Sequence, residues 1–191
     1  MANKLISIKT VVAIGIGAAI MFVLMRFVAI PSGIPNTNLN LSPAIVAVFA
    51  AVFGPLAGLF IGFIGHTLTD LTWGSPWWSW IIADAIFGLL IGIFWKFFKV
   101  EEGKFALPQV LIFNLTQILA NAVAWVVIAP TLDILIYQEP SDKVIVQGAV
   151  ASALNAGVIL TIGTILLLGY SRTRIKAGSL KQGGEYNASK K

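Results

Sequence analysis

The chain has 191 residues, of which 58% are hydrophobic and only 11% are charged, and its net charge is +5. This composition, with a mean hydropathy of +0.89, excludes an ordinary soluble domain and is typical of a polytopic membrane protein. The absence of cysteine excludes disulfides, Cys-ligated zinc and thiol chemistry. Lysine and arginine lie near the ends of apolar segments and in the C-terminal tail, a pattern that disfavours nucleic acid as a partner.

Apolar stretches predict membrane-spanning helices, each near the roughly 17 to 25 residues that a span needs. Five of them are clear: Ser7–Val28, Pro55–Leu71, Ser79–Phe98, Pro108–Ala129 and Val144–Tyr170. A shorter stretch, Leu41–Phe53, precedes the pair Gly54 and Pro55. Because proline is favoured at the first position of a helix and glycine suits a chain reversal, we predict a turn at this pair and six helices.

The predicted fold is therefore all-α: a six-transmembrane-helix bundle over residues 1–170 with both termini in the cytoplasm. A flexible, basic cytoplasmic tail is expected over residues 171–191 because this segment has no periodic apolar face. Every Lys and Arg except Arg26 and Lys143 then lies inside, as the positive-inside rule requires. A five-helix alternative moves only Lys4, Lys9 and Arg26, so charge bias alone does not separate the two topologies.

A stripe at four-residue spacing runs along the helix that follows Gly54. Gly54, Gly58 and Gly62 offer bare backbone for close packing, and His66 and Asp70 continue the same face. Ionisable groups at membrane depth are costly and by default indicate a pathway or a binding site, so we expect this stripe to point into a pocket. The alternatives are a hydrogen bond between His66 and Asp70 alone, or a helix-end role for Asp70.

Other polar and aromatic groups are expected near the same outer level. The loop Trp73–Trp80 supplies four indoles, and the loop Ile30–Asn40 is rich in proline and amides, as suits an ordered lid. Flat aromatic faces with amide groups suit a small, planar, polar heterocycle. The residues that we expect to contribute, besides His66 and Asp70, are Trp77, Trp78, Asp84, Asn121, Trp125, Gln147 and Asn155. The open alternatives are an interfacial aromatic belt and amides that bond neighbouring helices.

Small residues on the first helix predict a docking face. Ala13 and Gly17, and likewise Gly15 and Ala19, form pairs four residues apart that let another helix approach closely. Packing within the bundle is the alternative interpretation.

Enzyme chemistry has little support in the sequence. It contains no phosphate-binding glycine loop, no multi-histidine metal spacing and no ATPase motif, so we expect no metal site and no cofactor in this chain. One functional interpretation of the polar helices is a stand-alone homo-oligomeric channel or carrier. A membrane enzyme that uses His66 and Asp70 is the least favoured interpretation.

Five stretches carry a resemblance to a known family: Val11–Ala19, Ile34–Asn40, Phe53–Leu56, Gly62–Leu71 and Gly74–Ile81. The chain resembles the substrate-binding S component of an energy-coupling factor (ECF) vitamin importer, within the group labelled riboflavin-type. The resemblance implies a six-helix protein of the bacterial plasma membrane that binds a vitamin near the outer face. It also implies that small residues of the first helix dock on a transmembrane coupling (T) subunit, which carries two ABC ATPases that bind ATP and Mg.

The resemblance also assigns residues and a ligand class. It places Asn36, Asn38 and Asn40 on the lid between the first two helices. It also implies that the ligand-facing helices carry Asp84, Asn121, Trp125, Gln147 and Asn155. It implies hydroxymethylpyrimidine, pyridoxine or riboflavin as the ligand, and the compact polar site favours the smaller rings. Transport is expected to proceed by tilting of the whole bundle on the coupling subunit.

Overall fold

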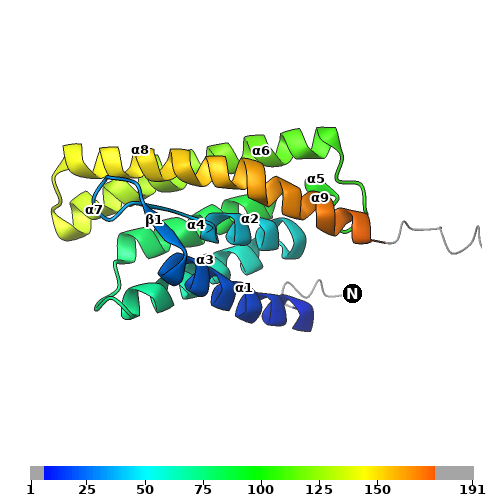
Figure 1. Ribbon diagram of the computed structural model, residues 1–191, viewed down its shortest axis with the longest axis horizontal. Coiled ribbons are helices and arrows are strands. Elements are labelled where there is room, and N and C mark those ends of the chain that lie inside the picture. The colour runs from blue at the N-terminus through cyan, green and yellow to red at the C-terminus, as the bar shows by residue number, and fades with distance from the viewer. Residues whose placement is uncertain (1–6, 175–191) are drawn as a thin grey trace, which may run out of the picture.

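A bundle of apolar helices with one short β-hairpin makes up the part of the chain that the computed structural model describes, residues 7–174 (Figure 1). The helices are α1 (Ile8–Phe27), α2 (Ser42–Phe53), α3 (Pro55–Leu71), α4 (Trp78–Ile93), α5 (Trp95–Phe98), α6 (Leu107–Asn121), α7 (Ala129–Tyr137), α8 (Ser141–Val158) and α9 (Thr164–Thr173). Two π-helical segments, η1 (Ala122–Ile128) and η2 (Ile159–Gly163), join α6 to α7 and α8 to α9.

Within residues 7–174, three continuous helices are long and apolar enough to cross a membrane: α1, the 31-residue stretch from α6 to α7, and the 33-residue stretch from α8 to α9. The shorter α2, α3 and α4 are also apolar. The predicted break before Pro55 is present, since α2 ends at Phe53 and Gly54 adopts a φ of +89° that glycine accepts without strain. The mostly helical expectation is thus confirmed.

A two-stranded hairpin is the exception to the all-α prediction. Strands β1 (Ala29–Pro31) and β2 (Asn38–Asn40) pair antiparallel, with Ile30 opposite Leu39. The loop between them is held by Ser32, whose hydroxyl donates to the carbonyl of Thr37 at 2.6 Å. The segment expected as an ordered lid is therefore a β-hairpin, which the sequence analysis did not predict.

The long helices extend beyond their predicted ends. The helix expected to end at Ala129 continues through Pro130 to Tyr137, because the π-helical turns of η1 directly precede this proline. An α-helix would place the proline ring against a carbonyl four residues earlier, whereas the wider π turn leaves room for it. Helix α9 likewise continues to Thr173, which shortens the predicted tail; residues 175–191 lie outside the described residues.

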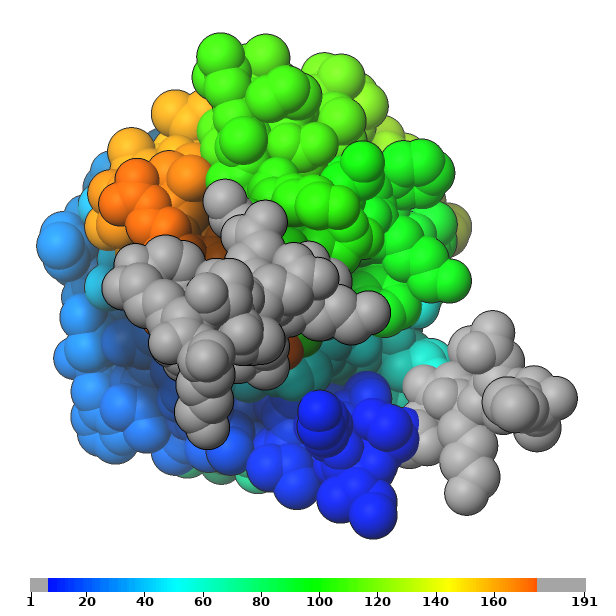
Figure 2. Space-filling model, turned by 90° about the vertical axis from the view of Figure 1, so that its right-hand side faces the viewer, coloured from blue at the N-terminus to red at the C-terminus, as the bar shows by residue number. Residues whose placement is uncertain are grey.

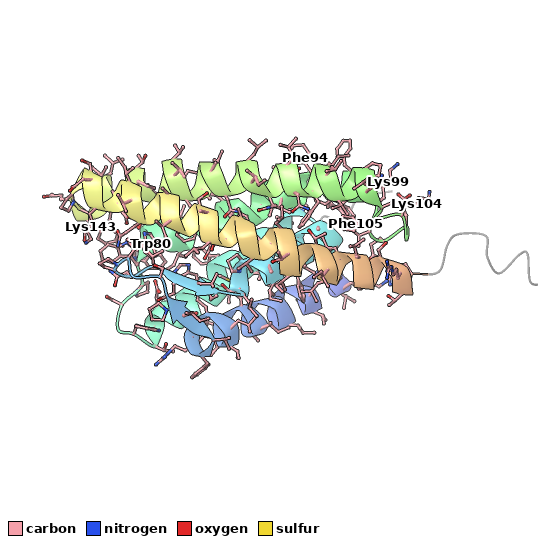
Figure 3. All side chains as sticks on the ribbon, turned by 45° about the horizontal axis from the view of Figure 1, so that its top comes forward. Trp80, Phe94, Lys99, Lys104, Phe105 and Lys143 are labelled. Atoms are coloured by element: carbon pink, nitrogen blue, oxygen red, sulfur yellow. The ribbon has the colours of Figure 1, made fainter. Side chains whose placement is uncertain are left out.

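The two ends of the bundle differ. The hairpin and the α7–α8 connection lie at one end, called here the hairpin end, whereas the start of α1 and the end of α9 lie at the opposite end (Figure 1). Figure 2 views that opposite end, where the first turns of α1 (dark blue), the segment around the start of α6 (green) and the last turns of α9 (orange) lie. In Figure 3, Trp80 and Lys143 lie at the hairpin end, and Lys99 and Lys104 lie at the other.

Candidate ligand-binding site

A cavity of about 250 Å³ lies at the hairpin end, between the hairpin and helices α3, α4, α7 and α8. Ten of the twelve residues predicted to contact a ligand line it: Asn36, Asn38, Asn40, His66, Asp70, Trp77, Asp84, Trp125, Gln147 and Asn155. Residues from segments more than a hundred positions apart in the sequence therefore meet around one hollow. Toward the opposite end, Ile61 and Phe87 are fully buried one turn beyond His66 and Asp84, so apolar packing closes the cavity there.

An acid–histidine–acid cluster forms one wall. The Nδ1 atom of His66 lies 2.6 Å from Oδ2 of Asp84, and its Nε2 atom lies 3.6 Å from Oδ1 of Asp70. The second oxygen of Asp70 accepts the backbone N–H of Trp77 at 2.8 Å. His66 and Asp84 are buried, whereas Asp70 remains partly exposed. The main partner of His66 is therefore Asp84 on the neighbouring helix rather than Asp70 one turn away.

The glycine stripe brings these groups together. A Cβ atom on Gly62 would collide with the backbone carbonyl of Asp84, and one on Gly58 would collide with the carbonyl of Gly88. Helices α3 and α4 thus pack backbone against backbone, as small residues allow in membrane proteins. Because Gly62 precedes His66 by one turn, this close contact sets the distance between His66 and Asp84.

The indoles are positioned by an acid that the sequence analysis missed. Asp133 on α7 is 2% exposed and accepts the indole N–H groups of Trp77 at 2.7 Å and Trp80 at 2.8 Å. The hydroxyl of Ser79 donates to the same carboxylate. Trp77 also stacks on Tyr137, with ring centroids 3.9 Å apart. A lone acid in the apolar run after Pro130 was the available signal, but the helix was expected to end before it.

Two predicted ligand residues do not line the cavity. Trp78 is 44% exposed and stacks on Phe63 on the outside of the bundle, because it lies one position away from the face that Trp77 and Trp80 share. Asn121 is fully buried, and its amide donates to the side chain and the carbonyl of Gln117. The π-helical turns that follow Asn121 rotate Trp125 away from it, although their spacing of four predicts a common face.

The hairpin is attached to both sides of the cavity entrance. Gln147 on α8 donates its amide N–H to the carbonyl of Pro35 at 2.7 Å, which joins the hairpin loop to α8. Asn40 accepts the backbone N–H of Ser42 at 2.9 Å and the Ser42 hydroxyl at 2.5 Å, so it orients the first turn of α2. Asn36 occupies the left-handed region with a φ of +57°, which asparagine tolerates better than most residues. The side chains of Gln147 and Asn40 therefore stabilise the position of the hairpin.

Replacing Gln147 with leucine is expected to release the hairpin loop from α8. Loss of one such hydrogen bond is worth about 0.5 to 1.5 kcal/mol, so ligand dissociation should accelerate roughly threefold to tenfold. Stopped-flow measurement of tryptophan fluorescence during ligand exchange measures this rate. Gln109→Leu, at the start of α6, is the matched control and should leave the rate unchanged; equal rates in both variants would contradict the lid assignment.

Among the amides of the cavity wall that are at least half-buried, two have no side-chain hydrogen bond within residues 7–174, and the exposed Asn36 has none either. The side chain of Asn155 is 7% exposed, lines the cavity and makes no hydrogen bond within this part of the chain. The side chain of Asn38, which is half-buried, also lines the cavity without a hydrogen bond there. Buried polar groups in proteins are normally paired, so these two amides and the buried indole N–H of Trp125, which also lacks a partner, are the candidates for hydrogen bonds to a ligand. They are available for binding, whereas Gln147 and Asn40 are already engaged.

Helix α1 divides its small residues between two faces. Ala13 and Gly17 are buried, and a Cβ atom on Gly17 would meet Ile61 and Phe49, so this pair packs inside the bundle. Gly15 and Ala19 are exposed, and nothing lies within 4 Å of a Cβ atom on Gly15. Only the second pair presents a surface to another chain.

The family model described as "ECF-type riboflavin transporter, S component" matches residues 5–172 of this chain. The chain belongs to this family. The S components are transporter subunits rather than enzymes, which removes the reading of His66 and Asp70 as a catalytic pair. Membership of this family and the apolar helices together identify the chain as a bacterial membrane protein.

Curated relatives of this S component match over nearly their whole length. A UPF0397 protein of Lacticaseibacillus casei (strain BL23) is 52% identical over 181 residues, covering 94% of this chain and 97% of the relative. A UPF0397 protein of Staphylococcus aureus (strain bovine RF122 / ET3-1) is 49% identical over 183 residues, covering 95% and 100%. The fold is also similar to that of FolT, solved bound with folic acid, with a TM-score of 0.54 and 14% identity over 86% of this chain and 95% of that chain.

Proposed function

We propose that this S component captures a small, planar, heterocyclic vitamin or vitamin precursor from outside the cell. The observation that carries the proposal is the cavity at the hairpin end, in which four indoles and the unpaired amides of Asn38 and Asn155 surround a hollow. Indole faces stack on planar rings, and unpaired amides give such a ring its orientation. No comparable polar lining is present in the apolar groove beside α1 within the described residues.

The size of the cavity favours the smaller members of the ligand class. Its volume of about 250 Å³ equals that of about eight water molecules in the liquid. This space suits a single substituted ring, such as hydroxymethylpyrimidine or pyridoxine. Riboflavin, with three fused rings and a sugar-alcohol chain, requires the hairpin to move away.

Delivery to the cytoplasm requires the whole bundle to reorient. The buried side chains of Ile61 and Phe87 lie between the cavity and the opposite end, so apolar packing closes the cavity between α3 and α4. In the proposed topology, six helices span the membrane, the hairpin end faces outward and both termini are cytoplasmic. The exposed Gly15 and Ala19 of α1 dock on a transmembrane coupling subunit, and two ABC ATPases that bind ATP and Mg drive the tilting.

Ligand binding to the purified protein tests the first part of the proposal. We expect calorimetry in lipid nanodiscs to show that hydroxymethylpyrimidine or pyridoxine binds more tightly than riboflavin. Asn155→Leu removes a hydrogen bond to the ligand and should weaken binding about tenfold. Thr161→Val, an exposed position in the same continuous helix, is the control and should bind like the wild type. Absence of binding for all three compounds would contradict the proposed function.

Copurification tests the docking face. Gly15→Leu should reduce the recovery of coupling subunit and ATPases with this chain while ligand affinity stays unchanged, because a side chain at this position meets nothing within the bundle. Gly157→Leu, another exposed glycine with open space around it, should retain the complex. A stable oligomer of this chain alone, dissociated by Gly15→Leu, would instead support the channel or carrier.

A further inference from the structure

Carboxylates outnumber cations around the cavity. Among the described residues that line it, Asp70, Asp84, Asp133 and Glu139 are acids, whereas Lys143 is the only lysine or arginine and His66 the only histidine. Negative charge in a membrane-embedded cavity is costly unless donors or cations compensate it. The chemistry of the ligand therefore depends on which of these acids already have partners.

Two of the four acids are satisfied by the protein. Glu139 forms an ion pair with Lys143 at 2.6 Å near the cavity entrance. Asp133 accepts three hydrogen bonds, from Trp77, Ser79 and Trp80. These contacts leave the cluster of Asp70, His66 and Asp84, in which one imidazole lies between two carboxylates. Even with His66 fully protonated, two carboxylates and one imidazolium sum to a charge of −1.

Two carboxylate oxygens in this cluster lack a hydrogen bond among residues 7–174: Oδ1 of the partly exposed Asp70 and Oδ1 of the more deeply buried Asp84. The Oδ2 atom of Asp84 contacts His66 at 2.6 Å, but its Oδ1 atom has no hydrogen-bond partner in this part of the chain. Asp84 is 4% exposed and lines the cavity, so this oxygen has little access to bulk water. An ionised carboxylate is an acceptor only, so the partner that it lacks is a hydrogen-bond donor on the ligand, and a positively charged donor also compensates the excess negative charge.

We infer that the ligand carries an amino-substituted, basic ring whose N–H group donates to Oδ1 of Asp84. This inference rests on the proposed function and narrows its ligand class. A basic ring brings positive charge next to a cluster with an excess of negative charge. The indoles of Trp80 and Trp125, which meet edge to face with centroids 5.7 Å apart, offer aromatic surfaces that favour a cationic ring over a neutral one.

Matched pairs of ligands test the inference on the complete purified protein. One pair is 4-amino-5-hydroxymethyl-2-methylpyrimidine and its 4-oxo counterpart, and the other is pyridoxamine and pyridoxine. Calorimetry in nanodiscs should show that the amino member of the preferred pair binds roughly 10-fold to 100-fold more tightly, as expected for a hydrogen bond to a charged group.

Variants locate the origin of that preference. Asp84→Asn should reduce it to within about threefold, because the amide carries no charge. Asp70→Asn should reduce it in part and retains the acceptor for the Trp77 N–H group, so it serves if Asp84→Asn fails to fold. Asp142→Asn removes an exposed acid at the start of α8, outside the cavity lining, and should keep the full preference.

The possible outcomes separate the inference from the proposed function. Equal affinity for both members of each pair, or tighter binding of the oxo or hydroxyl members, would overturn the inference while the heterocycle-binding function stands. Preference for the amino member that persists in both Asp84→Asn and Asp70→Asn would also overturn it, since another group would then be responsible. Failure of every compound to bind would overturn both.

Discussion

Replacing Gly62 with alanine is expected to weaken ligand binding at least about tenfold and to destabilise the fold by about 2 kcal/mol or more. The added methyl group would meet the backbone carbonyl of Asp84, and backbone cannot move aside as a flexible side chain does. Helix α3 must therefore shift away from α4, which lengthens the 2.6 Å contact between His66 and Asp84. Thermal unfolding and calorimetric titration of the purified variant measure the two effects.

Gly157→Ala is the matched control for this change. Gly157 also lies within a helix, but nothing is within 4 Å of a Cβ atom there, so alanine should leave both the melting temperature and the affinity near their wild-type values. If Gly62→Ala behaved like Gly157→Ala, the proposed role of backbone packing in placing His66 and Asp84 would be wrong.

Asp133→Ala should produce the second large effect, a loss of about 3 kcal/mol in the free energy of unfolding together with weaker ligand binding. The carboxylate accepts hydrogen bonds from two indoles and one hydroxyl, and each donor left without a partner costs roughly 1 to 3 kcal/mol where it is buried. Trp77 and Trp80 would lose the contact that fixes their orientation toward the cavity. Chemical denaturation and the near-ultraviolet circular dichroism of the indoles measure these changes.

The control for Asp133 is Asp142→Asn, which removes an exposed acid nine positions along the chain. This variant should retain the wild-type stability and indole spectrum. Retention of both properties in Asp133→Ala would show that packing alone, including the stacking of Trp77 on Tyr137, orients the indoles.

The four-residue spacing in the sequence was sufficient to predict which residues share one face of α3. Residues four apart on a helix share a face whatever the neighbours are, so Gly62, His66 and Asp70 were correctly placed on one stripe. The partner of His66 was not determined by that spacing. It depends on how closely α4 approaches, which only the tertiary contact between Gly62 and the Asp84 backbone determines.

The missed features depend on departures from regular helix geometry. The π-helical turns of η1 separate Asn121 from Trp125 and let the helix pass Pro130, which brings Asp133 to the site. A pattern analysis that assumes 3.6 residues per turn has no means of detecting such turns. The hairpin was likewise missed, because its three-residue strands are too short to show the alternating pattern of a sheet.

Asn38 and Asn155 have a further consequence, because they face the hollow without bonding to the rest of the described chain. Substitutions at these two positions leave the helix contacts intact, whereas substitutions at Gly62 or Asp133 alter the scaffold. Changes at these two positions can therefore alter which nutrient binds without disturbing the backbone contact between α3 and α4.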